Sequence, residues 1–149
     1  MRYTETGDTM DVLIKTFSGL YDVHGTFLAP SWQSFMRSRC ASQWTTLEGR
    51  LAFLKSHTPP VRPLPIVIDE KHCYLPLSSL RLAEVTLINV CAVVACYARG
   101  YDTMIVFQDG HEMAVGIALK AMQSKVRKCQ AWLGALEGLR QNRFHSRMG

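Results

Sequence analysis

Apolar and polar residues alternate through much of the second half of the chain, with the two-residue period of half-buried β-strands. From residue 87 to residue 98 the even positions are apolar, and we predict one long strand over 87–98. Asn89 and Tyr97 lie at its odd positions, so this face is expected to be partly exposed or to contact a partner. Two short strands are predicted before it, at residues 66–69 and 73–77, around a polar turn.

The strongest local signal is the pair Asp109-Gly110 between two alternating apolar runs. A two-residue type I′ turn needs positive φ at both central positions, and Asp-Gly is a favoured pair for it. We therefore predict a hairpin in which Gln108 lies opposite His111. This register places four apolar side chains on one face: Met104, Val106, Met113 and Val115.

The first half of the chain carries weaker signals. Residues 10–16 and 26–29 are predicted as strands on either side of a turn at residues 19–25. Residues 30–39 are predicted to form one or two helical turns, with an apolar side made of Trp32, Phe35 and Met36.

The segment between the two halves is marked by proline. Residues 47–57 fit either a strand or a helix, and residues 58–65 contain four of the six prolines. Proline restricts its own backbone conformation and disfavours the helical conformation in the residue before it. Residues 58–65 should therefore be an extended connector.

Apolar residues recur at intervals of three and four from residue 119 onward, which predicts a C-terminal amphipathic helix. The stripe consists of Leu119, Met122, Val126, Cys129, Leu133 and Leu136. The basic residues that fall off the stripe are Lys120, Lys125, Arg127 and Lys128. The next stripe position is Arg140, so we predict a helix over about 119–138 and a basic tail over 139–149. The expected fold is mostly β, of the α+β class: antiparallel strands and hairpins closed by this helix.

Length and composition narrow the class of protein. A chain of 149 residues suits a single domain over 1–149, and 48% apolar with 19% charged residues excludes a disordered chain. The longest mostly apolar run, residues 85–98, is shorter than the roughly 20 residues that span a bilayer. The polar first eleven residues lack the apolar core of a secretory signal. We therefore expect a cytoplasmic protein with no membrane partner.

Signatures of metal binding and catalysis are weak. The five cysteines form no C-x-x-C pair, which favours buried reduced thiols over disulfides or zinc. His111-Glu112 begins like a zinc-protease motif, but Val115 stands where the second histidine is needed. Asp69, Glu70 and His72 fit a charged turn better than a catalytic cluster. We predict no catalytic residue, no metal site and no cofactor, and a small Cys/His hydrolase is the less favoured alternative.

Positive charge is concentrated in two segments. The chain carries 17 basic and 12 acidic residues, for a net charge of +5. Residues 37–62 carry five bases and one acid, and residues 120–149 carry seven bases and one acid, whereas acids predominate elsewhere. Such clustering favours a polyanionic partner, nucleic acid in particular. A domain whose basic helix binds an acidic protein or an anionic membrane surface remains the alternative.

Five short motifs occur in a characteristic order: TLEGR at 46–50, PLPIVID at 63–69, YLPLSS at 74–79, IN at 88–89 and TMIVFQDG at 103–110. Together they resemble the competence transcription factor (ComK) family of Gram-positive bacteria. Leu77 replaces a family threonine, Leu87 replaces a tryptophan, and the C-terminal tail is shorter. The second half alone is also similar to the LytTR DNA-binding domains of response regulators.

Both resemblances imply sequence-specific binding of double-stranded DNA. The first implies a transcription activator that acts at A/T-rich promoter sites through minor-groove contacts and as more than one protomer. In longer members the tail takes part in adaptor-mediated proteolysis, so a proteolytic adaptor is a further candidate partner. The candidate DNA-binding residues are Arg37, Arg39, Arg50, Lys55, Arg62, Arg81, Arg99, Lys125 and Lys128.

Overall fold

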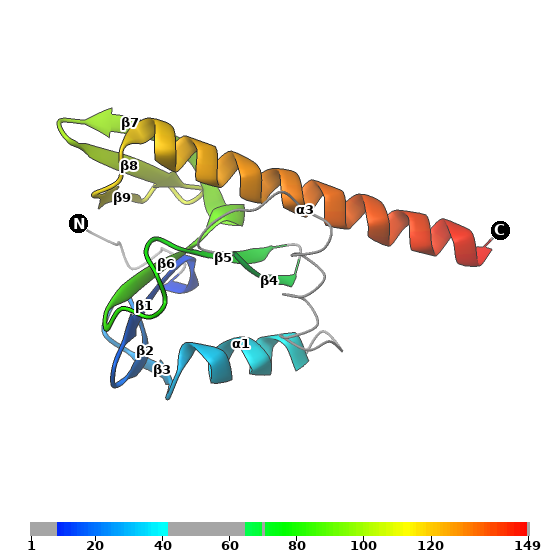
Figure 1. Ribbon diagram of the computed structural model, residues 1–149, viewed down its shortest axis with the longest axis horizontal. Helices are drawn as coiled ribbons and strands as arrows, with labels where there is room; N and C mark the ends of the chain where they lie inside the picture. Colours follow the sequence, from blue (N-terminus) through cyan, green and yellow to red (C-terminus); the bar gives the residue numbers. More distant parts are fainter. Residues whose placement is uncertain (1–8, 42–64, 70, 149) are drawn as a thin grey trace.

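In a computed structural model of the chain, the described residues are 9–41, 65–69 and 71–148. They form two antiparallel sheets and two α-helices (Figure 1). The larger sheet has the order β3-β2-β1-β6-β5-β4, and the smaller has the order β7-β8-β9. This arrangement confirms the expected fold class, a mostly β fold with a C-terminal helix.

The larger sheet is built from six short strands. They are β1 (Val12–Thr16), β2 (Gly19–Asp22), β3 (Phe27–Ala29), β4 (Ile66–Asp69), β5 (His72–Pro76) and β6 (Val85–Asn89). A single turn of 3-10 helix, η1 (Thr9–Asp11), precedes β1. The predicted strands at 66–69 and 73–77 are confirmed to within one residue as β4 and β5.

The smaller sheet contains β7 (Val93–Arg99), β8 (Asp102–Phe107) and β9 (Glu112–Val115). A second 3-10 turn, η2 (Val90–Ala92), connects β6 to β7 and so joins the two sheets. Helix α1 (Trp32–Ala41) follows β3, and helix α3 (Leu119–Met148) follows β9. No helix in the described ranges is long and apolar enough to cross a membrane.

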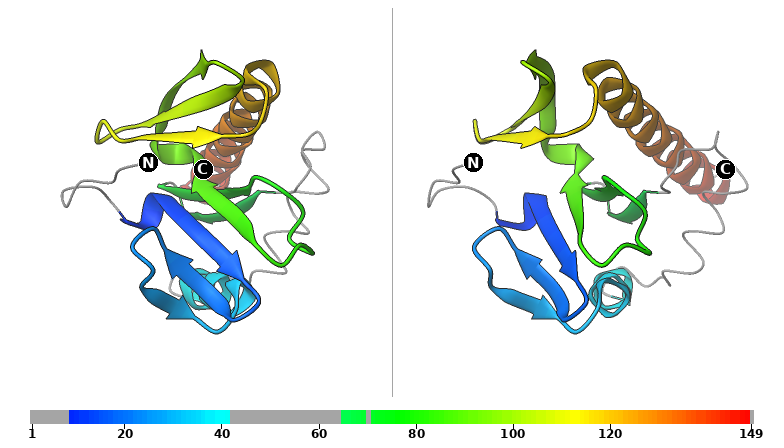
Figure 2. Two further views of the ribbon diagram at one scale, coloured as in Figure 1. Left: turned by 90° about the vertical axis from the view of Figure 1, so that its left-hand side faces the viewer. Right: turned by 60° about the vertical axis from the view of Figure 1, so that its left-hand side comes forward.

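The layers are α1, the larger sheet, and then the smaller sheet with α3 (Figures 1 and 2). Phe35 and Met36 of α1 pack on one face of the larger sheet, against residues such as Leu13. The other face contributes Val12 to a core shared with the smaller sheet and α3. Because both faces of the sheet are covered, even its edge strand β4 consists of a continuous buried apolar run, Ile66-Val67-Ile68.

The predicted long strand over 87–98 is wrong: the chain leaves the larger sheet at Asn89 and enters the smaller one at Val93. Asn89 is only 3% exposed and caps η2, because its side chain accepts a hydrogen bond from the Cys91 N–H. Val94, predicted on the apolar face, is 60% exposed. The alternation continues across the break because each sheet has its own buried face.

The predicted turn over 19–25 is also wrong, since residues 19–22 form β2. The actual turns flank this strand. After it, the Asp22 carboxylate accepts hydrogen bonds from the N–H groups of His24 and Thr26, at 2.8 and 3.0 Å. Gly19 is needed within the strand because an added Cβ would lie 2.8 Å from the Ala29 carbonyl oxygen, where β3 approaches.

The hairpin between β8 and β9 is confirmed, but its register differs by one residue. Ile105 lies opposite Met113, and the Phe107 N–H donates to the His111 carbonyl at 2.8 Å. The loop therefore has three residues, 108–110, rather than two. The Gly110 N–H donates to the Phe107 carbonyl at 2.9 Å, and Gly110 itself has φ +90°. Consequently the face that α3 covers carries Ile105, Phe107, Met113 and Val115, in place of the predicted set with Met104 and Val106.

Helix α3 begins at the predicted residue but continues to Met148, ten residues beyond the predicted end. Its stripe covers the sheet as expected: Met122, Val126 and Cys129 are buried, and Leu133 packs against the same core. Gly138 does not stop the helix because one glycine costs only about 1 kcal/mol, and no proline follows it. The prediction that this helix closes the β domain is therefore confirmed.

Helix α1 is confirmed and spans ten residues, with Phe35 and Met36 buried and Trp32 packed beside them. The predictions for residues 47–57 and for the proline-rich connector up to residue 64 lie outside the described residues.

Candidate nucleic-acid interface

The solvent-facing side of α3 carries a row of basic side chains. Lys120, Arg127 and Lys128 are exposed, and Lys125 lies half-buried beside them. The sequence from residue 113 to residue 136 contains no Asp or Glu, so positive charge predominates on this part of the helix. These four bases within nine residues of one helix are its basic face.

The packing of α3 fixes the orientation of this basic face. Met122 and Cys129 are fully buried, and Val126 is 7% exposed. Lys120 and Arg127 are seven residues apart, about two helical turns, so they project from the same side, away from the buried stripe. Because the apolar stripe of α3 packs in the core, the helix that carries the bases is already ordered before a partner binds.

The spacing of the bases suits a duplex. From Lys120 to Lys128 the helix rises about 12 Å. Double-stranded DNA carries about one charge per 1.7 Å of its axis, or about seven phosphates over that length. The helix also continues well beyond the sheets, as Figure 1 shows toward the C-terminus. The phosphate backbone of a DNA duplex can therefore lie along this end of α3 without contacting the two sheets.

The structure does not bring the two basic segments together. Arg37 and Arg39 are exposed on α1, which covers the face of the larger sheet opposite to α3 (Figure 2). The Arg39 guanidinium lies over the Phe35 ring, 5.1 Å from its centroid, and lines a pocket of about 590 Å³ between α1 and β3. One flat duplex surface cannot include both helices.

The other candidate residues are scattered. Arg81 is exposed in the loop between β5 and β6, and Arg99 is exposed at the end of β7. Near Arg99, the Tyr97 hydroxyl donates to the Glu112 carboxylate at 3.0 Å. Three further candidates lie outside the described residues: Arg50, Lys55 and Arg62. Of the residues predicted for DNA binding, the structure places Lys125 and Lys128 on α3 and Arg37 and Arg39 on α1.

Among the described residues, two histidine–aspartate pairs occur, each within a turn that joins two strands. His72 Nδ1 lies 3.0 Å from Asp69, and His111 Nδ1 lies 2.8 Å from Asp109. Burial raises the pKa of Asp69, but the hydrogen bonds from Lys71 N–H and His72 outweigh it and hold the pKa below its ordinary value. Within the described ranges, no three His, Cys, Asp or Glu side chains form a group that could hold a metal ion.

The thiols are poorly suited to nucleophilic chemistry. Cys40, Cys73 and Cys129 are buried, and Cys91 and Cys96 are half-buried. Burial raises the pKa of Cys91 to about 11 and that of Cys129 to about 12, so both thiols stay protonated near neutral pH. Burial raises the pKa of Cys96 as well.

No protein-family model matches this chain, and no curated protein or solved structure matches it significantly. The resemblance to the competence and LytTR families therefore depends on the five short motifs. The basic face of α3 depends on the fold itself, and it is the feature from which we argue function.

Proposed function

We propose that this protein is a cytoplasmic DNA-binding transcription factor that contacts duplex DNA through the basic face of α3. The observation that carries the proposal is this basic face, with Lys120, Lys125, Arg127 and Lys128 on a helix anchored in the core. Lysine and arginine gain affinity by neutralising phosphates and releasing counterions. Arg127 can also bind a phosphate through two parallel hydrogen bonds.

The motif resemblance supports a more specific proposal about the type of transcription factor and its DNA sites. It supports an activator of the competence (ComK) type, acting at A/T-rich promoter sites as a homo-oligomer. A/T tracts narrow the minor groove and deepen its negative potential, which favours inserted arginines. Arg127 on α3 and Arg99 on β7 are the described, exposed candidates for such insertion.

The alternatives are weaker on physical grounds. An interfacial membrane helix needs a free apolar face, but Met122, Val126 and Cys129 of α3 are buried in the core. A cysteine hydrolase needs an ionisable thiol, whereas burial raises the pKa of Cys91 and Cys129 to about 11 and 12. An acidic protein partner remains the second candidate for the same basic face, because it would satisfy the same charges.

The test is a fluorescence anisotropy series with A/T-rich and G/C-rich duplexes of equal length. If the four α3 bases neutralise four phosphates, affinity should fall about 150-fold between about 50 and 200 mM salt. The A/T-rich duplex should bind more tightly at every salt concentration. An affinity that does not change with salt would contradict the proposal, and preference for an acidic peptide over excess duplex would favour the second candidate.

A further inference from the structure

The turn between β7 and β8 carries a fully exposed aromatic residue. Arg99 and Asp102 pair across the two strands, which leaves a two-residue turn made of Gly100 and Tyr101. Gly100 has φ +63°, and glycine at the first position of such a turn is typical of a type II′ hairpin. The Tyr101 side chain is 104% exposed, so its ring contributes nothing to the core.

The turn is anchored to the rest of the protein although its tip is exposed. Thr103, two residues after Tyr101, is 1% exposed, and its hydroxyl donates to the Ile117 carbonyl just before α3. Thr103 also pairs with Ala98 on β7 and with Val115 on β9. The ring is therefore presented from a fixed support, the end of a three-stranded sheet.

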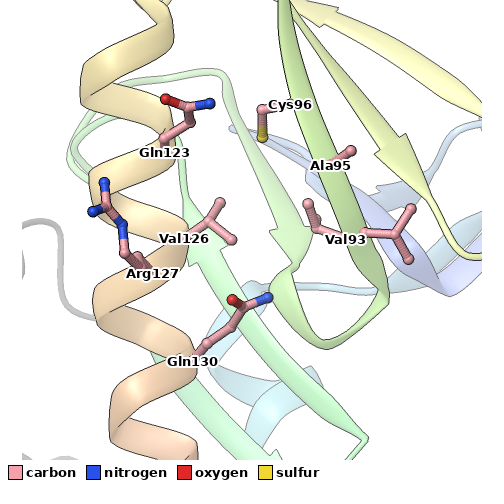
Figure 3. A pocket seen from close by; sticks show the side chains of 8 residues that line it. Val93, Ala95, Cys96, Gln123, Val126, Arg127 and Gln130 are labelled. Atoms are coloured by element: carbon pink, nitrogen blue, oxygen red, sulfur yellow. The ribbon is translucent and has the colours of Figure 1, made fainter.

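This turn lies at the end of the molecule where α3 begins. Figure 3 shows β7 beside α3, with Cys96, toward the end of the strand, level with Gln123, toward the start of the helix. β7 therefore runs toward the first turn of α3, and Figures 1 and 2 place the turn between β7 and β8 at the same end. Lys120, the first residue of the basic face, lies in this first helical turn. A duplex that follows the basic face past Lys120 can consequently meet Tyr101.

We propose that Tyr101 is a minor-groove wedge, whose ring inserts between two base pairs while the basic face of α3 binds phosphates. The inference rests on the proposed duplex-binding role and adds the residue that selects the base step. Side chains that insert in this way partly unstack a base step and kink the duplex. Pyrimidine–purine steps such as TA unstack most easily. The ring therefore favours A/T sites that contain TA steps over uninterrupted A-tracts.

The surroundings of Tyr101 favour a base step over a protein or a membrane as its partner. Its neighbours in the turn are Gly100, which has no side chain, and the oppositely charged Arg99 and Asp102, so the tip carries no net charge. Protein and membrane contacts need a wider apolar area than one ring supplies. One flat ring on a narrow turn suits the minor groove, which is about 6 Å wide.

The test compares two duplexes of equal length whose centres contain only A·T pairs, one with alternating TA steps and one with an uninterrupted A-tract. Tyr101→Ala should weaken binding to the TA duplex at least about fivefold, and binding to the A-tract duplex no more than about twofold. Energy transfer between dyes at the duplex ends should show a bend that the natural chain produces and Tyr101→Ala does not. Tyr101→Phe keeps the ring and should retain both effects.

Phe17→Ala is the matched control. Phe17 is 92% exposed in the two-residue turn between β1 and β2 of the larger sheet, so its loss should change neither the preference for TA steps nor the bend. Circular dichroism should show every variant folded, because the substituted side chains are exposed. Tyr101→Ala removes no charge, so the slope of log affinity against log salt should stay that of the natural chain.

The outcomes separate the wedge from the duplex-binding role of α3. Binding by the natural chain without a bend, or a bend that Tyr101→Ala retains, would overturn the wedge and leave the role of α3 intact. A loss with Tyr101→Phe as large as that with Tyr101→Ala would also overturn it, by assigning the contact to the hydroxyl. A natural chain that binds neither duplex would overturn both proposals.

Discussion

The side-chain oxygen of Asn89 accepts a hydrogen bond from the backbone N–H of Cys73, at 3.0 Å. The same oxygen accepts from the Cys91 N–H at 3.2 Å, and the Asn89 amide donates to the Lys71 carbonyl at 3.0 Å. One buried side chain therefore connects the start of β5 to the point where the chain passes between the two sheets. No apolar residue can satisfy these three backbone groups.

Replacing Asn89 with leucine should consequently destabilise the protein. Asn89→Leu leaves two N–H groups and one carbonyl without this partner, and each buried unsatisfied group costs about 1–3 kcal/mol. We expect a loss of about 2–4 kcal/mol in the free energy of unfolding, measured by urea denaturation. Gln108→Ala is the control, because Gln108 also donates to a backbone carbonyl, that of Cys91, but is exposed. A loss no larger than that of the control would show that water replaces the Asn89 amide.

Asn89 also marks a feature of the fold that the sequence pattern does not predict, the break between β6 and β7. Its neighbours alternate with the period of a strand on both sides, so the pattern predicts one strand through residue 89. Only the pairing of β6 with β5 and of β7 with β8 reveals that two different sheets impose the same period. By contrast, four residues of the α3 stripe (Met122, Val126, Cys129 and Leu133) were predictable, because a helix needs only local spacing and one buried face.

The candidate DNA-binding residues were also only partly predictable from the sequence. The sequence identifies the bases of α3 because they fall off the stripe, and the structure confirms that Lys120, Arg127 and Lys128 are exposed. It could not show that Arg37 lies across the larger sheet from them, since that depends on which face α1 covers. The position of β7 at the edge of the smaller sheet was likewise not predictable, because an edge strand is defined only by the order of the sheet.

The turn between β8 and β9 yields a matched pair of glycine variants. Gly110 has φ +90°, a conformation that favours glycine, and an added Cβ at this residue meets nothing within 4 Å. Gly110→Ala should therefore cost about 1 kcal/mol through backbone strain alone. Gly116 is equally open and has no positive φ, so Gly116→Ala should be neutral or slightly stabilising. Equal midpoints for the two variants in thermal unfolding would contradict the three-residue turn.

The buried thiols predict how stability depends on pH. Burial raises the pKa of Cys91 to about 11 and that of Cys129 to about 12, from an ordinary value of 9.0. Between pH 9.0 and these raised pKa values, the folded protein binds more protons than the unfolded chain. The free energy of unfolding should therefore fall as the pH rises above 9. Below pH 9 these thiols are neutral in both states and contribute no slope.

Urea unfolding in the presence of a reductant, at several pH values from about 8 to 11, measures this slope. Cys129→Ala should unfold more easily at neutral pH, because it leaves a cavity in the core, but should lose less stability as the pH rises. An identical slope in the variant and in the natural chain would show that Cys129 ionises as freely in the folded state as in the unfolded one.

Charge reversal on the two opposite surfaces decides which of them binds DNA. The α3 variant combines Arg127→Glu with Lys128→Glu, and the comparison variant combines Arg37→Glu with Arg39→Glu on α1. All four side chains are exposed, and both variants change the net charge equally, so circular dichroism should show both folded. If α3 is the interface, its variant loses two phosphate contacts, and the slope of log affinity against log salt falls by about 2. The comparison variant should keep the slope of the natural chain, apart from a small loss of affinity through long-range repulsion. The reverse result, a reduced slope only in the comparison variant, would move the interface to the side of α1.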